Sequence, residues 1–254
     1  MPSPARALVV LLFSLSFTAP ARAVVLKQER VPLGVLEQSW TPGFGLPNTL
    51  NAAILDIANP AYANPSGDHT VGVLTNASPD SGGLALACTD ANGANDYDWE
   101  GWFFTGAGDT RRGLVLRANP ANGFQDCYQL VINAGLFTIA LRKLVLGAPT
   151  TLGSWTANIL PGGVPQQNTW HHLKVSAVGN ALRCWFDDFE LTGGTPIVDG
   201  TNPLTTGWVG VYNFRFDLGQ VPVYYDDLTL SGDTITDARL QTWGAVKTRY
   251  RGAR

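Results

Sequence analysis

The chain has 254 residues, of which 45% are hydrophobic and only 15% are charged, and its formal net charge is -3. This length suits one sizeable β domain with its own core, because β-sandwiches often reach roughly 200–250 residues as single domains. The low charge, the 28 glycines and the 8 tryptophans are typical of extracellular β proteins, and no clustered basic face indicates a nucleic-acid partner.

Residues 1–23 have the features of a cleaved signal peptide. Arg6 precedes an apolar stretch over residues 7–17, and residues 21–23 (Ala-Arg-Ala) have the small side chains that signal peptidase prefers. The alternative is a membrane anchor, but the stretch is about half of the ~20 residues that a helical span needs. No later segment is long and apolar enough to cross a bilayer. We therefore expect a chain that starts near Val24 after cleavage and is secreted, periplasmic or displayed at the cell surface.

A single domain of short β-strands is predicted over residues 24–232. Prolines interrupt residues 24–67, where we expect one or two edge strands. Segments rich in β-branched and aromatic residues then recur at roughly 8–14-residue spacing without helical stretches, which favours antiparallel pairing in two packed sheets. The predicted strands are 83–89, 98–105, 113–118, 126–133, 137–146, 154–159, 170–177, 182–191, 207–214 and 221–230.

The end of the chain differs in character from the predicted β domain. Leu240, Trp243, Val246 and Tyr250 recur with a period of about 3.6 residues, which predicts a short amphipathic helix in a basic tail over residues 233–254. Such a tail suits docking on a cell-surface or protein partner, or sorting. The alternative is a frayed, solvated end.

The cysteines and histidines do not form a strong metal or redox pattern. Cys88, Cys127 and Cys184 each lie in a strand-like segment, where a free cysteine behaves as a small buried hydrophobe. Three cysteines allow at most one internal disulfide. His171 and His172 are adjacent on a predicted strand and therefore face opposite sides of it, so they cannot easily share one metal ion.

A predicted hairpin carries a family resemblance. Residues 170–175 (Trp-His-His-Leu-Lys-Val) are followed by a turn at residues 179–180 (Gly-Asn) and an aromatic strand that ends at residues 184–188 (Cys-Trp-Phe-Asp-Asp). The supporting motifs, in the expected order, are Gly113–Arg117, Tyr128–Val131, Trp208–Val211 and Val223–Leu228. The pattern resembles the concanavalin A-like lectin/glucanase superfamily, including laminin-G-like domains. The resemblance implies an all-β, two-sheet antiparallel jelly-roll sandwich with one concave and one convex sheet.

The resemblance implies a function only coarsely, because one fold hosts lectins, hydrolases and adhesion domains. We predict a secreted carbohydrate-binding or surface-interaction module without catalysis, which binds a polysaccharide or glycoconjugate on the concave sheet. One alternative is a glycoside hydrolase of the laminarinase or lichenase type, or a polysaccharide lyase, on the same fold. Another is a structural or adhesive secreted domain displayed through the basic tail.

The candidate catalytic residues are Asp96, Asp98 and Glu100. They resemble the Glu-x-Asp-x-Glu strand of laminarinases and lichenases, and alternation along a strand places all three carboxylates on one face. The resemblance would make the first carboxylate the nucleophile and the last the acid/base. However, the first position is an aspartate, and the strand precedes that of Arg117 instead of lying in mid-domain. We therefore favour an acidic loop edge leading into a core strand.

Two acidic pairs, residues 187–188 and 226–227, lie where unpaired carboxylates are costly to bury. The resemblance implies a structural calcium ion held by Asp226 together with backbone carbonyls, since hard oxygen ligands suit calcium. In the alternative interpretation these carboxylates accept hydrogen bonds from loop N–H groups or pair with Arg183 or Arg215.

Glycan binding requires aromatic platforms beside polar hydrogen-bonding groups. The predicted ligand-binding residues are Trp102, Arg117, Tyr128, Arg142, Trp185 and Asp187, with Gln129, Trp208 and Tyr212 as further candidates. For each aromatic residue the alternative is a place in the core, which is where most aromatic side chains of a sandwich lie.

Overall fold

The computed structural model describes residues 23–44, 49–59, 62–74, 84–105, 110–133, 138–215 and 222–232. The predicted tail and, apart from Ala23, the predicted signal peptide lie outside these ranges. Among the described residues, no helix is long and apolar enough to cross a membrane.

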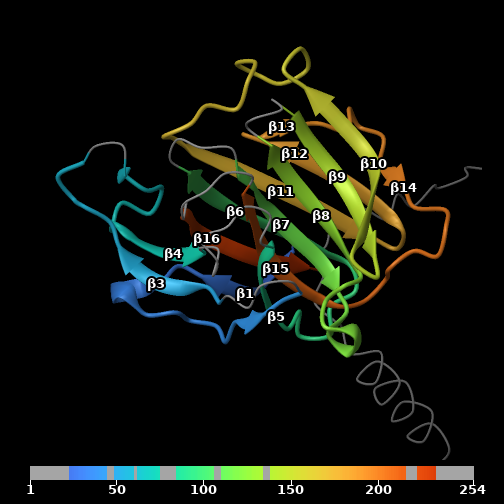
Figure 1. Ribbon diagram of the computed structural model, residues 1–254, viewed down its shortest axis with the longest axis horizontal. Helices are drawn as coiled ribbons and strands as arrows, with labels where there is room; N and C mark the ends of the chain where they lie inside the picture. The colour runs from blue at the N-terminus through green and yellow to red at the C-terminus, as the bar shows by residue number, and fades with distance from the viewer. Residues whose placement is uncertain are drawn as a thin grey trace, which may run out of the picture.

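The chain folds into two antiparallel sheets, which overlap in the view of Figure 1 and confirm the predicted all-β sandwich. Sheet A has nine strands. Its spatial order is β13 (Phe189–Glu190), β12 (Ala181–Phe186), β11 (Trp170–Val178), β6 (Tyr97–Thr105), β16 (Val223–Gly232), β4 (Thr70–Leu74) and β3 (Asn51–Ile54), with β1 (Val24–Glu29) on β16 and β14 (Ile197–Val198) on β12. Sheet B has seven strands in the order β10 (Ala148–Thr156), β9 (Thr138–Val145), β8 (Cys127–Asn133), β7 (Thr110–Ala118), β15 (Trp208–Arg215), β5 (Leu84–Thr89) and β2 (Thr41–Pro42). Two short 3-10 turns, η1 (Pro32–Gly34) and η3 (Pro120–Asn122), complete the described elements.

The main core fills the space between the two sheets. Trp99 of β6 and Leu114 of β7 belong to it, each at most 2% exposed. Two polar contacts cross this core, since Trp99 donates from Nε1 to the carbonyl of Gly210 at 3.0 Å and Tyr225 donates from its hydroxyl to the carbonyl of Tyr212 at 2.7 Å. The buried aromatic donors are therefore satisfied by backbone carbonyls of the opposite sheet.

A second apolar cluster covers the other face of sheet B. Val115, Val131 and Tyr212 belong to it, whereas their neighbours Leu114 and Leu130 belong to the main core. Because successive side chains of a strand point to opposite faces, the second cluster lies on the face of sheet B that is turned away from sheet A. We call this face the outer face of sheet B.

The predicted hairpin around residues 179–180 is confirmed. Val178 of β11 pairs with Ala181 of β12, and Gly179 between them has a φ of 55°, a conformation that glycine adopts without strain. Along β11 the burial alternates residue by residue, so one set of side chains enters the core and the other forms the outer face of sheet A.

Several strands differ from the predicted pattern. β4 was not predicted, because its sequence Thr-Val-Gly-Val-Leu contains a glycine that weakens the strand signal. This glycine, Gly72, is needed for packing, since a Cβ there would lie 2.9 Å from Cδ2 of Leu50. The strand predicted at 154–159 overlaps only the end of β10, which runs from Ala148 to Thr156, and residues 157–159 form a turn. The strand predicted at 182–191 is divided by a turn into β12 and β13.

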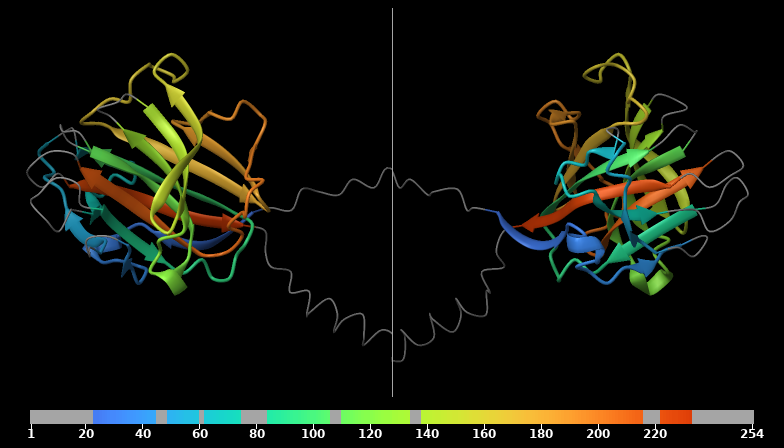
Figure 2. Two further views of the ribbon diagram at one scale, coloured as in Figure 1. Left: turned by 45° about the vertical axis from the view of Figure 1, so that its right-hand side comes forward. Right: turned by 90° about the vertical axis from the view of Figure 1, so that its left-hand side faces the viewer.

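The first and last strands meet at one end of the sandwich. Val24 of β1 pairs with Gly232 of β16, and Figure 2 shows the blue and orange-red strands meeting at the point where the described chain begins and ends. The described domain thus closes on itself through its two terminal strands.

Candidate functional site

The predicted catalytic carboxylates lie at and near the start of β6. Asp98 and Glu100 project from the outer face of sheet A, because their neighbours Tyr97 and Trp99 are buried in the core. Lys174 Nζ lies 2.7 Å from Asp98 Oδ2 and 3.6 Å from Glu100 Oε2. The two carboxylates therefore share one ammonium partner on the neighbouring strand β11.

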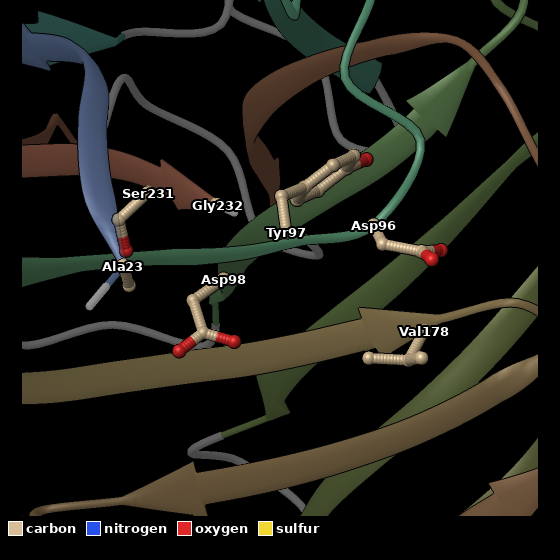
Figure 3. A pocket seen from close by; sticks show the side chains of 7 residues that line it. All are labelled: Ala23, Asp96, Tyr97, Asp98, Val178, Ser231 and Gly232. Carbon is tan, nitrogen blue, oxygen red and sulfur yellow. The ribbon is translucent and has the colours of Figure 1, made fainter. Parts of the chain in front are cut away.

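Asp96 lies apart from this ion pair, just before β6. Its Oδ1 accepts a hydrogen bond from the N–H of Gly179 at 2.8 Å and lies 3.8 Å from Arg117 Nη2. Figure 3 shows Asp96 and Asp98 beside a small pocket of about 180 Å³ near the end of β11, with the Tyr97 ring on the opposite side of β6. Each of the two carboxylates already has a partner within the protein.

The two predicted tryptophan platforms, Trp102 and Trp185, also lie on the outer face of sheet A. The Trp102 ring stacks on His172 with centroids 5.0 Å apart and an interplanar angle of 25°. The Trp185 ring has Lys174 Nζ at 5.7 Å and Arg183 Cζ at 5.1 Å from its centroid. Both rings are thus engaged by neighbouring side chains of the same sheet.

Asp187 lies in the turn that joins β12 to β13. One carboxylate oxygen accepts from the N–H of His172 at 2.8 Å, and the other lies 2.8 Å from His171 Nδ1. His171 is 6% exposed, and the centroid of its ring lies 4.9 Å from that of Phe186. His172 faces outward, so the two neighbours lie on opposite faces of the strand, as predicted. Asp187 therefore anchors its own turn against β11.

Arg117 and Tyr128 are fully buried, so they hold the fold together instead of facing a ligand. The Arg117 guanidinium donates to the carbonyls of Gly179 at 2.5 Å, Leu204 at 2.8 Å and Asn95 at 2.9 Å. The Tyr128 hydroxyl donates to Asp199 at 2.6 Å and accepts from the N–H of Leu204 at 3.0 Å. Both side chains tie loops to sheet B.

Lys143 on β9 makes a similar connection that the sequence analysis missed. Its ammonium lies 2.7 Å from Asp199 Oδ2 and donates to the carbonyls of Thr201 at 2.6 Å and Asn202 at 2.7 Å. Burial opposes ionisation of Asp199, but hydrogen bonds from Lys143 and Tyr128 outweigh it and lower the pKa of this carboxyl. The pair borders a pocket of about 570 Å³ at the edge formed by β9, β10 and residues 198–204.

The outer face of sheet B carries four of the predicted ligand-binding candidates. Arg142 Nη2 donates to Gln129 Oε1 at 2.7 Å, and the Arg142 guanidinium lies 5.6 Å from the centroid of the Tyr212 ring. Trp208 packs beside them in the same apolar cluster. Gln129 Nε2 and Arg142 Nε are buried and have no hydrogen-bond partner within the described part of the chain.

A pocket of about 220 Å³ opens beside Arg142 on the same face. Arg111, from β7, also lines it, with its guanidinium 5.6 Å from the centroid of the Phe214 ring. The remaining lining residues are Val131, Asn133, Thr138, Ala140, Thr151 and Ser154. The pocket therefore presents guanidinium, amide and hydroxyl groups from four neighbouring strands. Arg111 and Asn133 escaped the sequence analysis, because a strand pattern alone does not show which polar side chains border a hollow.

The oxygen ligands around Asp226 converge on one point. Asn64 Nδ2 has four oxygens around it: Ser66 Oγ at 2.8 Å, Asp226 Oδ2 at 2.9 Å, Asp68 Oδ1 at 3.1 Å and the carbonyl of Thr70 at 3.2 Å. An amide nitrogen has only two protons to donate, so this set of acceptors is larger than the amide can satisfy. Asp226 is fully buried, and this burial raises its pKa to about 6. The hydrogen bond from Ser66 lowers the pKa, whereas the negative charge of Asp227 raises it further.

These residues fit a calcium ion in their chemistry. Within the described part of the chain, no group of three or more His, Cys, Asp or Glu side chains could hold a metal ion. The cluster at Asp226 instead combines two carboxylates with a hydroxyl and a backbone carbonyl oxygen, which are hard ligands that calcium accepts. The amide oxygen of Asn64 lies outside this set, since it accepts from the N–H of His69 at 3.0 Å. The sequence analysis did not predict Asn64, Ser66 or Asp68. The signal that could have identified them is their alternation along one loop.

All three cysteines are free and buried, and Cys88 and Cys127 lie in the same apolar cluster. Burial raises the pKa of Cys127 to about 12 and raises those of Cys88 and Cys184 further above the ordinary range. Each thiol thus behaves as a buried apolar group, as predicted.

Comparisons with known proteins support the fold. No protein-family model and no curated protein matches the chain. Among solved structures, the carbohydrate-binding module CBM66 from Bacillus subtilis is 16% identical with a TM-score of 0.52 and covers 77% of this chain and 98% of its own. The catalytic domain of an endo-1,3-beta-glucanase (laminarinase) from Thermotoga petrophila is 12% identical with a TM-score of 0.53, covering 84% of this chain and 99% of its own.

A beta-1,3-1,4-glucanase (lichenase) from a mouse hindgut metagenome is 13% identical with a TM-score of 0.52, covering 80% of this chain and 97% of its own. At these identities the similarity concerns the fold alone, and one fold serves different functions. It agrees with a two-sheet jelly-roll sandwich, while the resemblance to the concanavalin A-like superfamily and to laminin-G-like domains stays a prediction.

Proposed function

We propose that the protein is an exported carbohydrate-binding module without catalysis, and that its ligand lies on the outer face of sheet B. The observation that carries this proposal is the pocket beside Arg142, lined by guanidinium, amide and hydroxyl groups that suit sugar hydroxyls. On the outer face of sheet A, by contrast, the tryptophan rings and carboxylates have partners within the sheet. The similarity in fold to a carbohydrate-binding module is consistent with this function.

A steric block tests where the ligand binds. Ala140 is half-buried in the pocket, so Ala140→Phe fills the hollow without changing its charge. Ser176→Phe on β11 places the same ring on the outer face of sheet A and is the matched control. Binding to a polysaccharide panel is measured by affinity electrophoresis and thermal shift. We expect Ala140→Phe to abolish binding and Ser176→Phe to leave it intact, and the reverse pattern would refute the assignment.

Glycoside hydrolysis at Asp98 and Glu100 is the second candidate function. The observation that favours it is that both carboxylates contact Lys174 Nζ, at 2.7 and 3.6 Å, and so lie near each other on one face, because glycosidases use a pair of carboxyl groups that flank the bond they cut. Release of reducing ends from the same panel is measured in parallel. Release that disappears in Glu100→Gln would establish the hydrolase, whereas binding without release supports the non-catalytic module.

We also infer that a structural calcium ion is bound by oxygens of Ser66, Asp68, Thr70 and Asp226, in place of the Asn64 amide nitrogen that they now surround. These ligands connect the loop before β4 to the last strand, so the ion would stabilise the fold. At a calcium concentration of about 100 times Kd, binding adds ~2.7 kcal/mol, or roughly 5–11 °C in Tm for a domain of this size.

Calorimetric titration and melting in calcium against chelator test this inference. Asp68→Asn should remove most of the calcium-dependent shift. Asp56→Asn is the control, since Asp56 lies in the same β3–β4 connection and only caps its own turn, accepting from the N–H of Ala58 at 2.9 Å. No heat of binding and equal melting temperatures in calcium and chelator would contradict the site.

A further inference from the structure

The charge of the sheet B pocket indicates more than a general affinity for sugars. Of the residues that line it, Arg111 and Arg142 are cationic, and none of the described lining residues is acidic. The chain as a whole has a formal net charge of -3, so this hollow is locally opposite in sign to the protein. A guanidinium also donates to neutral sugar hydroxyls, but an anionic group can take two parallel hydrogen bonds from one guanidinium and balance its charge.

The arginine side chains are held in place by their surroundings. Each guanidinium lies 5.6 Å from the centroid of an aromatic ring, Arg111 over Phe214 and Arg142 over Tyr212. Arg142 is also fixed by its hydrogen bond to Gln129 at 2.7 Å. A guanidinium donates from a planar fork whose geometry matches the oxygens of a carboxylate or sulfate. The rings therefore orient the cations and are themselves covered by them.

The size of the pocket limits what enters it. Its volume of about 220 Å³ is below the roughly 300–1,000 Å³ of pockets that enclose a whole drug-sized ligand. It therefore suits one sugar unit of a longer chain, which continues across the exposed hydroxyls of Thr151 and Ser154 on β10.

We propose that the ligand is an anionic polysaccharide, and that Arg111 and Arg142 recognise a carboxylate or sulfate group on one of its sugar units. This inference rests on the proposed function and names the ligand class of the same pocket. It differs from the predicted mechanism of aromatic stacking, because here the aromatic rings support guanidinium groups and charge-assisted hydrogen bonds make the contact with the sugar.

The experiment compares three probes on the purified protein by calorimetric titration at low and physiological salt: a short oligogalacturonate, a sulfated dextran oligosaccharide and a neutral galacto-oligosaccharide. The variants are Arg111→Gln, Arg142→Gln and Arg142→Lys. Arg183→Gln is the matched control, since Arg183 also lies over an aromatic ring, Trp185, but on sheet A. Thermal melting of each variant confirms that it is folded, and Arg111→Gln suffices if Arg142→Gln does not fold.

We expect an anionic probe to bind better than the neutral one, with an affinity that falls as salt rises. Each pocket Arg→Gln change should weaken binding by about 10–100-fold, the value of a charge-assisted hydrogen bond. Arg142→Lys should recover only part of the loss, because lysine lacks the planar fork, and Arg183→Gln should bind like the unmodified protein. Whether oligogalacturonate or sulfated dextran binds identifies the anion as carboxylate or sulfate.

The failures of the two proposals are distinguishable. One outcome is that neutral and anionic probes bind equally well, that Ala140→Phe blocks binding and that the Arg→Gln changes do not affect it. This result would refute the anionic ligand but would leave the sugar site on sheet B in place. Binding that survives both Ala140→Phe and the pocket arginine changes would overturn the site on sheet B. If no probe and no polysaccharide of the panel binds, both proposals are wrong.

Discussion

Replacing Lys143 with methionine tests how strongly one buried ammonium holds the loop of residues 199–202. Lys143 is 7% exposed and Asp199 4%. The change removes the cationic partner of this buried carboxylate, which keeps its hydrogen bonds from Tyr128 and the Thr201 N–H, and it leaves the carbonyls of Thr201 and Asn202 without the ammonium donor. Removing one partner of a buried ion pair costs about 3–5 kcal/mol, which corresponds to roughly 6–20 °C in Tm for a domain of this size. We expect this loss in urea unfolding at neutral pH.

A second variant and the pH dependence make this prediction specific. Lys143→Met combined with Asp199→Asn should lose less stability than the two single changes together, since the residues are in contact. The pKa of Asp199 is lowered in the folded state. Its contribution is therefore present above the unfolded value of about 3.9 and lost as the pH falls through the lower folded value. Lys143→Met should weaken this acid-dependent loss. A cost below about 1 kcal/mol, or additive effects in the double variant, would refute the reasoning.

Three further outcomes follow from buried or paired groups. The free thiols should not react with a thiol reagent in the native protein and should react fully after denaturation, so a thiol that titrates without denaturant would contradict their burial. A hydrogen bond from Arg183 lowers the pKa of Glu190 to about 2, with a further contribution from Thr192. The stabilisation of the fold by this ion pair should be complete above the unfolded pKa of Glu190 and should decline as the pH approaches 2. Melting temperatures measured across this pH range should show the decline in the unmodified protein and not in Arg183→Gln. Gly101→Ala places a Cβ 2.4 Å from Leu228 Cδ2 and 3.1 Å from its Cα, which should cost about 1–3 kcal/mol of overpacking; an unchanged Tm would argue against this tight contact.

The local pattern of the chain was enough to predict the sandwich. The hairpin of β11 and β12 combines alternating burial with a glycine turn, and both features depend on neighbouring residues. Alternation also predicted that Asp98 and Glu100 share a face. It did not show that Lys174, on the strand beside them, pairs with both.

The candidate sites depend on contacts that no local pattern contains. Asn64 meets Asp226 across 162 residues of sequence, and Lys143 meets the carbonyl of Asn202 across 59. Arg117 and Arg142 have similar sequence contexts, since each lies in a strand rich in aliphatic residues. Only the packing of the sheets shows that the first is buried among loop carbonyls and the second borders a pocket.

The position of β16 has a consequence for how the protein is made. This last strand pairs with β6, β4 and β1, so it lies inside sheet A instead of at its edge. Until residues 223–232 have left the ribosome, β6 and β4 each lack a neighbour and the sheet cannot close. Such non-local pairing delays folding. We therefore expect a nascent chain to stay incompletely folded until residues 223–232 are available to pair with β6, β4 and β1.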